Sequence, residues 1–187
     1  MFVYIHPENS PAYDGEENSG IDNLERQLLH IIHDYGNLCR FILCGDFNAR
    51  TGQGLDYLVD DGIDYLPIEN EYTEDDFCLP RDVIDFNSNN YGRALLELCK
   101  LLGVHLVNGR TSSDFPANFT FISHTGSSTV DYYVVSSCIF ESITDMSVVE
   151  RTEWDHLPIV CHFKDLTPCA VPQNNNVSST VGISKCC

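Results

Sequence analysis

The sequence predicts a single α/β or α+β domain, in which sheets pack against each other and helices lie outside them. Two observations indicate this fold class. Short apolar runs rich in Val, Ile, Tyr and Phe are interspersed with two amphipathic segments of helical period. The chain also has 187 residues, 43% of them hydrophobic, which is enough for one sizeable core. We expect this domain to cover residues 1–165.

The first elements form a β-α-β unit. A strand is expected over residues 2–5 and is stopped by Pro7. A helix then runs to Tyr35 and ends at Gly36. Its apolar residues recur on one face: Ile21, Leu24, Leu28, Ile31, Ile32 and Tyr35. Residues 40–44 form a buried strand, and the crossover between the two strands is expected to be right-handed.

A second helix and five further strands complete the expected elements. The helix covers residues 91–102, has an apolar side rich in Leu, and ends at Gly103, which suits a left-handed C-terminal cap. The strands are expected at residues 104–107, 119–122, 130–135, 142–150 and 157–163.

A long acidic loop, residues 51–90, separates the two halves of the domain. Between Thr51 and Pro80 it has nine acids and no Lys or Arg, which is half of the net charge of −18. The segment lacks the ligand spacing of an EF-hand, so a solvated, mobile loop is the simpler expectation. The negative charge also argues against tight, non-specific binding to DNA by this chain.

The remaining features set the expected environment. Residues 166–187 are rich in Pro, Asn, Ser and Thr and are expected to be a disordered tail. Five of the nine cysteines lie beside apolar residues and are expected in the core, whereas Cys186 and Cys187 are open to a thiol role, acylation or no role. No apolar run is long enough for a bilayer and no signal-type N-terminus is present, so nuclear or cytoplasmic residence without secretion is expected.

The first polar motif is Gly45-Asp46-Phe47-Asn48, directly after the apolar run at 41–44. Alternate residues of a strand share a face, so Asp46 and Asn48 lie together and Phe47 points into the core. A carboxylate there can position or deprotonate water, and an amide two residues on can orient that water. A plain Asx-turn after a strand is the competing explanation.

Two further motifs contain an acid or an imidazole near strand ends. Asp131 lies in a run of aromatic and β-branched residues, where burial without a partner would be costly. Asp155 and His156 precede the last apolar run. The imidazole can donate to a phosphate oxygen or accept a proton. Taken singly, the Asp-His pair is also compatible with an ordinary loop.

The order Gly-Asp-Phe-Asn, Ser-x-x-Asp-Tyr, Asp-His-x-Pro resembles the endonuclease/exonuclease/phosphatase superfamily. It is most similar to the endonuclease domain of non-LTR retrotransposons, because Ala-Arg-Thr-Gly at residues 49–52 also matches that version. The resemblance implies a four-layer αββα sandwich with a mixed β-sheet core. It also implies that the sandwich is incomplete here, because the family's first strands, which carry an Asn and a metal-binding Glu, have no counterpart in this sequence.

The resemblance assigns roles to individual residues. Asp131 would pair with His156, and Asp155 would bind the metal, Mg²⁺ or Mn²⁺. Tyr4 would contact phosphate, although a core tyrosine is an equal alternative. Asn9 would contact the leaving phosphate. Substrate-facing roles are also implied for Asn108 and Arg110, where turn formation is the simpler explanation.

The implied activity is metal-dependent hydrolysis of a DNA phosphodiester, with a linked reverse transcriptase domain as a partner and no membrane. Two alternatives stay open. One is a non-catalytic pseudo-enzyme or binding remnant of the same fold, which the absent Glu and the charge of −18 favour. The other is an inositol or lipid phosphatase, whose relatives usually show a Trp-Cys-Asp-Arg string that residues 128–131 lack. The absent Glu predicts that this chain alone is inactive or nearly so.

Overall fold

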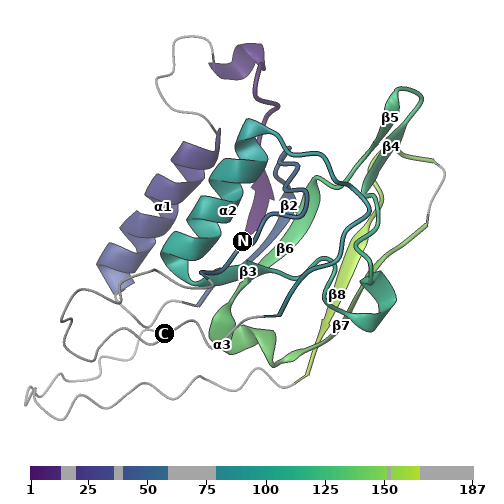
Figure 1. Cartoon of the computed structure of the whole chain (residues 1–187). Coiled ribbons are helices and arrows are strands. Elements are labelled where there is room, and N and C mark those ends of the chain that lie inside the picture. Colours follow the sequence, from purple (N-terminus) through teal and green to yellow (C-terminus); the bar gives the residue numbers. More distant parts are fainter. Residues whose placement is uncertain (14–19, 36–39, 59–78, 151–152, 165–187) are drawn as a thin grey trace, which may run out of the picture.

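A computed structural model describes residues 1–13, 20–35, 40–58, 79–150 and 153–164. Figure 1 shows a four-stranded sheet with two long helices against one face and a two-stranded sheet, residues 143–148 and 159–163, on the other side. Most of the expected acidic loop (59–78) and the expected tail (166–187) lie outside the described residues, so their mobility and disorder stay predictions.

The sheet consists of β1 (Phe2–Tyr4), β2 (Ile42–Asp46), β6 (Asp131–Ser136) and β3 (Val104–Leu106), in that order across the sheet. β1 runs parallel to β2, as the β-α-β pattern requires, whereas β6 is antiparallel to both β2 and β3. The expectation of a mixed sheet is therefore confirmed. β2 and β6 are the two central strands, so the Gly-Asp-Phe-Asn and Ser-x-x-Asp-Tyr motifs lie beside each other.

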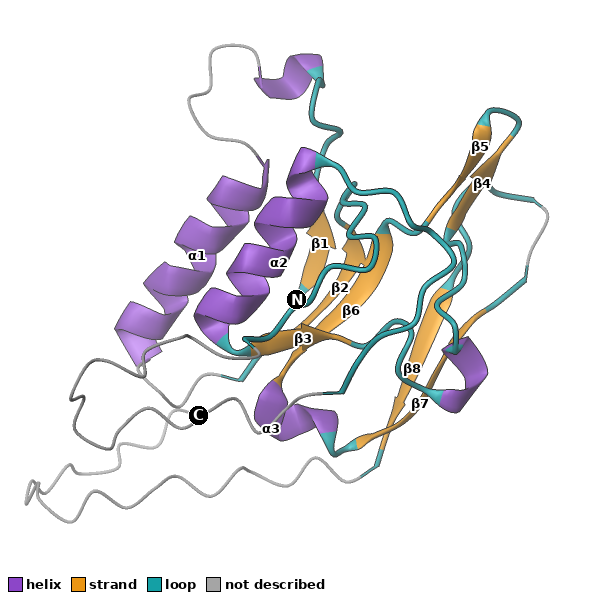
Figure 2. Ribbon diagram, in the orientation of Figure 1, coloured by secondary structure: helices purple, strands orange, loops and turns teal. Residues whose placement is uncertain are grey.

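Helices α1 (Gly20–Tyr35) and α2 (Asn90–Leu102) cover one face of this sheet and lie side by side (Figure 2). Their apolar stripes meet the inward side chains of β2, β3 and β6 in the main core. The side chain of Asn89 caps α2 by accepting from the Gly92 N–H at 2.7 Å. Gly103 ends the helix in the left-handed conformation, with φ 58°.

The opposite face of the sheet is covered by β7 (Ile143–Val148) and β8 (Ile159–Phe163), an antiparallel pair. Alternate residues of β8 pack into a second core with the far side of β6, to which α3 (Ser137–Phe140) also contributes. Helices, sheet and the β7–β8 pair make three layers, which fits the expected sandwich with a mixed sheet.

Some elements differ from the expectation. The strand expected at 119–122 is observed as β4 (Phe121–Ser123), and it pairs with β5 (Gly126–Ser128), which the sequence pattern did not indicate. The described residues also include the 3-10 turns η1 (Pro11–Tyr13) and η3 (Ser112–Asp114). Cys138 was expected in the core but is exposed, because α3 turns it outward. None of the described helices combines the length and apolar character needed to cross a membrane.

Asp56 lies in the acidic segment that was expected to be a solvated, mobile loop, and for this residue the expectation is wrong. It is fully buried instead of solvated. Its carboxylate accepts a fork from Arg110 at 2.6 and 2.7 Å and the Leu106 backbone N–H at 2.8 Å. Burial alone would raise the pKa of Asp56, but the Arg110 guanidinium outweighs it and holds that pKa below its ordinary value.

Candidate catalytic centre

The backbone at Gly45 brings β2 against β1 more closely than any side chain permits. Gly45 has φ 140°, and a Cβ placed there would lie 2.0 Å from the carbonyl oxygen of Val3. The next residues alternate as expected, since Phe47 is fully buried and Asp46 faces the other way, toward the site. The glycine of the motif is thus required by the approach of the neighbouring strand.

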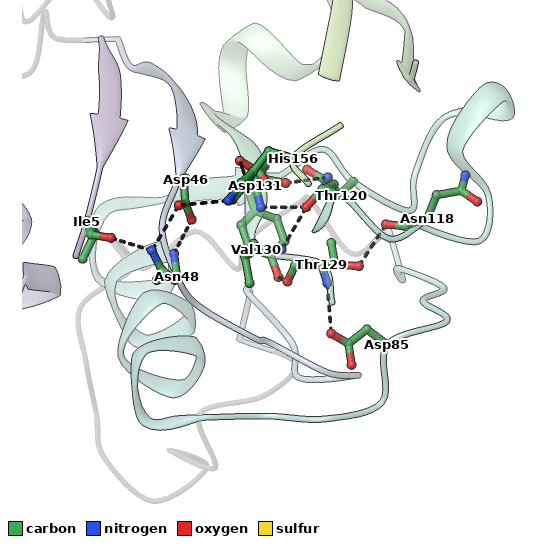
Figure 3. A network of polar contacts seen from close by, with 12 residues as sticks. Ile5, Asp46, Asn48, Asp85, Asn118, Thr120, Thr129, Val130, Asp131 and His156 are labelled. Atoms are coloured by element: carbon green, nitrogen blue, oxygen red, sulfur yellow. Dashed lines mark hydrogen bonds and ion pairs between the residues drawn. The ribbon is translucent and has the colours of Figure 1, made fainter. Parts of the chain in front are cut away.

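Asp46 and Asn48 are held in one arrangement by their own contacts (Figure 3). Asp46 Oδ1 accepts the Asn48 backbone N–H at 2.8 Å, so the Asx-turn is present. The Asn48 side-chain amide donates to Ile5 O at 2.7 Å and to Asp46 Oδ2 at 3.1 Å. Asn48 has φ 48°, a conformation that Asn tolerates better than most residues. The turn therefore fixes Asp46 in place, and its carboxylate is still aimed at the site.

His156 lies between two carboxylates that come from neighbouring strands. Asp46 and Asp131 are direct partners in the β2–β6 register. His156 Nδ1 lies 3.0 Å from Asp131 Oδ2 and 3.2 Å from Asp131 Oδ1 (Figure 3). Because an ionised carboxylate only accepts, Nδ1 is the donor and carries a proton. The other ring nitrogen, Nε2, lies 3.8 Å from Asp46 Oδ2.

The electrostatics of this trio favour a basic Asp46. The side chain of Asp46 is 13% exposed and the side chain of Asp131 is 12% exposed. The side chain of His156 is 45% exposed and therefore open to solvent. Burial raises the pKa of Asp46, and the charge of Asp131 adds to the rise, against the hydrogen bonds from Asn48. A carboxylate with a raised pKa accepts a proton from water more readily than an ordinary one.

Thr120 is a residue of this centre that the sequence pattern did not single out. Its hydroxyl oxygen accepts the backbone N–H groups of Val130 and Asp131, both at 3.0 Å, and its carbonyl accepts the Leu157 N–H at 2.7 Å. It therefore ties the start of β6 to the His156 segment. The available signal was a threonine between two phenylalanines in a strand, where its hydroxyl needs a partner once buried.

Tyr4 lies at the end of β1 beside Asp46, and Asn9 follows that strand. Tyr4 is the register partner of Asp46 across the β1–β2 pair, and it is 65% exposed. The alternative of a core tyrosine is therefore not what the structure shows. Its ring meets His6 edge-on, with centroids 5.0 Å apart. Asn9 is exposed, in the turn that follows β1.

Asn108 and Arg110 do not have the substrate-facing positions that the resemblance implied. Asn108 is fully buried, where its side chain donates to Asp131 O at 3.1 Å and accepts from Tyr133 N at 3.2 Å. Arg110 is committed to Asp56, and its side chain is only 1% exposed. Asn108 thus supports the strand that carries Asp131, and Arg110 belongs to the buried pair described above.

The grouping of possible metal ligands also differs from the expectation. Within the described part of the chain, ligand atoms of Asp46, Asp131 and His156 all lie within 4.8 Å of one another. Asp155 is not in this group. It is exposed, and its backbone carbonyl accepts the Ile122 N–H at 2.8 Å. Asp155 therefore lies outside this group of possible ligands, and its metal contact stays a prediction.

The donor set fits a hydrated divalent cation. Mg²⁺ keeps several waters and is usually held by one or two protein carboxylates together with substrate phosphate oxygens. Asp46 and Asp131 supply two such carboxylates, and a cation would relieve both the burial of negative charge and the repulsion between the two acids. His156 is bonded to Asp131 through Nδ1, and its Nε2 lies toward Asp46.

Solved structures with this fold are found among enzymes that act on nucleic acids. The endonuclease domain of TRAS1, a telomere-specific non-LTR retrotransposon, matches with a TM-score of 0.52 and 18% identity, over 88% of this chain and 57% of that one. The 3′ phosphatase NExo from Neisseria, bound to a product DNA hairpin, matches with a TM-score of 0.53 and 16% identity, over 87% of this chain and 60% of that one. A second structure, the 3′–5′ exonuclease NExo from Neisseria meningitidis, matches with a TM-score of 0.50 and 17% identity, over 87% of this chain and 59% of that one.

No family model matches the chain, and no curated protein matches it in sequence. The chain spans about three fifths of the length of the structures that it resembles. At identities of 16–18% the likeness concerns the fold. Together with the layers of helices, sheet and β7–β8 pair and the position of the three motifs, it leads to one conclusion: this chain has an endonuclease/exonuclease/phosphatase-like fold.

Proposed function

We propose that the domain, residues 1–165, is a phosphodiester hydrolase that uses Mg²⁺ or Mn²⁺ and acts on DNA, in the manner of a retrotransposon endonuclease. The observation that carries this proposal is the convergence of Asp46, Asp131 and His156 where the two central strands β2 and β6 meet. The DNA enzymes among the structures of the same fold support the choice of substrate.

Asp46 is the proposed base. It is fixed by Asn48 and shielded from bulk water, and one of its carboxylate oxygens can accept the proton of an attacking water that lies beside the cation. Asn48 acts on Asp46 by orienting its carboxylate, since its own amide is bonded to Asp46 and Ile5.

The pair of Asp131 and His156 is proposed to act on the developing charge at phosphorus. Asp131 holds the imidazole through Nδ1, which leaves Nε2 toward the centre and Asp46. From there a protonated ring can donate to a non-bridging phosphate oxygen, and that interaction strengthens as negative charge builds in the transition state. Tyr4, which is exposed in register with Asp46, offers a phenol to another phosphate oxygen, and the exposed Asn9 is proposed to contact the leaving phosphate.

A divalent cation held by Asp46 and Asp131 would neutralise phosphate charge and polarise the phosphorus centre. Two carboxylates are a sparse set of protein ligands, so we expect weak metal binding and low activity from this chain by itself. A linked reverse transcriptase and a nuclear or cytoplasmic site of action belong to the same proposal, by analogy with the TRAS1 element.

A non-catalytic role for the same fold is the second candidate. It is favoured by the net charge of −18, which opposes binding to polyanionic DNA. Among the described cations near the centre, Arg50 is already forked onto Asp85, with contacts of 2.6 and 3.0 Å. Weak, salt-sensitive DNA binding is therefore expected even if the centre is active.

The test is nicking of supercoiled plasmid at low salt, with Mn²⁺, with Mg²⁺ and with EDTA. We expect slow, metal-dependent nicking by the unchanged chain and none by Asp46→Ala or His156→Ala. The control is His30→Ala, which changes an exposed histidine on α1 and should keep the activity. No nicking by the unchanged chain with either metal would favour the non-catalytic candidate. Nicking that survives Asp46→Ala would show that this centre is not the catalytic one.

A further inference from the structure

The carboxylate of Asp85 lies outside the catalytic trio but joins three segments around it. Asp85 is 3% exposed. One oxygen accepts Arg50 Nη2 at 2.6 Å and the Asn87 N–H at 3.2 Å, and the other accepts Arg50 Nε at 3.0 Å and the Thr129 N–H at 3.0 Å. A single buried carboxylate therefore holds a forked guanidinium and two backbone donors.

The positions of its partners in the sequence connect Asp85 to both catalytic strands. Arg50 comes two residues after Asn48, in the chain that leaves β2. Thr129 comes two residues before Asp131, in the chain that enters β6 (Figure 3). Asp85 thus spans the gap between the segment that places Asp46 and the segment that places Asp131.

The Arg50 end of this link is rigid. Its backbone N–H donates to Asn89 Oδ1 at 2.8 Å, and its carbonyl accepts the Asn89 N–H at 3.0 Å. Gly92, in the first turn of α2, packs so closely that a Cβ on it would lie 1.7 Å from the Arg50 carbonyl oxygen. Helix α2 therefore fixes Arg50, Arg50 fixes Asp85, and Asp85 fixes the residue at which the chain turns into β6.

We infer that Asp85 is a positioning residue for the Asp131–His156 pair: through Arg50 and Thr129 it sets the direction in which Asp131 presents its carboxylate to the imidazole. The assignment rests on the proposed function only for its kinetic consequence. Burial alone would raise the pKa of Asp85, but the hydrogen bonds from Arg50, Thr129 and Asn87 hold it below its ordinary value, so the group is an anion in the folded protein.

The chain offers a matched control in the buried fork of Arg110 onto Asp56. That pair has the same chemistry and is also buried. Its carboxylate holds the β3 residue Leu106 rather than a strand end of the catalytic trio. A purely structural role would make Asp85→Asn and Asp56→Asn equivalent, whereas a positioning role separates them.

The experiment compares Asp85→Asn, Asp56→Asn and Arg50→Lys with the unchanged chain by imidazole ¹⁵N NMR at a pH where His156 is neutral. Bonded to Asp131, the ring carries its proton on Nδ1, which gives a distinct pair of ¹⁵N shifts. We expect Asp85→Asn to move His156 toward the Nε2–H form and Asp56→Asn to leave it unchanged, while both lower the unfolding midpoint. Arg50→Lys keeps the charge but loses the fork, so a smaller shift in the direction of Asp85→Asn is expected.

Nicking kinetics supply the second measurement. A misplaced Asp131 should lower kcat about 10- to 100-fold in Asp85→Asn with little change in KM, and Asp56→Asn should keep kcat. If Asp85→Asn does not fold, Arg50→Lys decides the question by the same two measurements. An unchanged His156 tautomer in the folded variants would overturn the assignment. If the unchanged chain does not nick DNA, the proposed function fails, and the NMR comparison still tests the role of Asp85.

Discussion

Asp46 and Asp131 are direct neighbours across the antiparallel pair of β2 and β6, and His156 supplies the imidazole that both carboxylates can reach. Two acids placed opposite each other in a sheet repel when both are ionised. Among the described register pairs of β2 and β6, Asp46 and Asp131 form the one pair in which both residues are acids. This pair lies where the chemistry is proposed.

The first prediction is that Asp46→Asn stabilises the protein while abolishing nicking. The pKa of Asp46 is raised in the folded state, so its contribution to stability is present at low pH and is lost as the pH rises toward neutrality. Removing the charge should raise the thermal unfolding midpoint at pH 7, by about 2–4 °C for each kcal/mol added to the free energy of unfolding. The gain should disappear at acid pH, where Asp46 is protonated. A lower midpoint at pH 7 would contradict this account.

The second prediction concerns acid unfolding. Asp56 and Asp85 both have lowered pKa values, so their stabilisation is present above the ordinary Asp value of about 3.9 and is lost as the pH falls below it. Unfolding midpoints should fall steeply below that pH in the unchanged chain. Asp56→Asn should be less stable at pH 7 and should show a shallower acid slope. Parallel pH curves for the two proteins would rule this explanation out.

The third prediction separates two glycines with similar backbones. Gly45 has φ 140° and lies against Val3, whereas Gly126 has φ 150° and nothing within 4 Å of the point that a Cβ would occupy. Gly126→Ala should lower the free energy of unfolding by about 1–3 kcal/mol, because it introduces backbone strain and nothing else. Gly45→Ala should lower the free energy of unfolding further, because β1 must also move away from β2. Chemical denaturation of both variants gives the comparison, and equal losses would mean that the β1 approach is unimportant.

The fourth prediction concerns metal binding. Asp131→Asn should weaken Mn²⁺ binding at least about tenfold, because it removes a carboxylate from the trio. Asp155→Asn should leave the affinity nearly unchanged, because its exposed side chain is outside the trio. Titration calorimetry or Mn²⁺ electron paramagnetic resonance can measure both. A larger loss in Asp155→Asn would restore the metal contact that the resemblance implied for that residue.

The fifth prediction follows from the exposed side chains of β1. Phe2 is 91% exposed on a strand that, among the described elements, has a neighbour on one side only. Wet apolar surface costs about 25 cal/mol per Å², so we expect a tendency to aggregate. Phe2→Ser should reduce both aggregation and binding of an apolar dye. Leu101→Ser, at a 59% exposed position on α2, is the control and should change them little.

The sequence was sufficient wherever a pattern was local. The apolar run before Gly45 predicted β2, and the 3.6-residue period predicted α1 and α2, the latter within one residue of its observed start. The pairing of Asp131 with His156 was implied by the family resemblance rather than by any local pattern. These features depend on periodicity or on a motif, and both can be read along a single chain.

The sequence was insufficient wherever a residue is defined by a distant partner. Asp56 could not be distinguished from the acids that follow it, because only its partner Arg110, in the loop after β3, makes it a buried group. Thr120 and Asp85 are in the same class, since each is defined by backbone N–H groups of another segment. β5 has a Gly-Ser-Ser sequence without strand character and exists through its pairing with β4.

Arg110 also determines where this domain tolerates change in chain length. Its guanidinium binds Asp56 through one edge, and its Nε donates to the carbonyl of Leu79 at 2.8 Å. One side chain therefore holds Asp56 and Leu79 close together, although they lie far apart in the sequence. Because closure entropy depends only weakly on the number of residues between two fixed points, the placement of Leu79 beside Asp56 is expected to tolerate changes in that number as long as Arg110 is present.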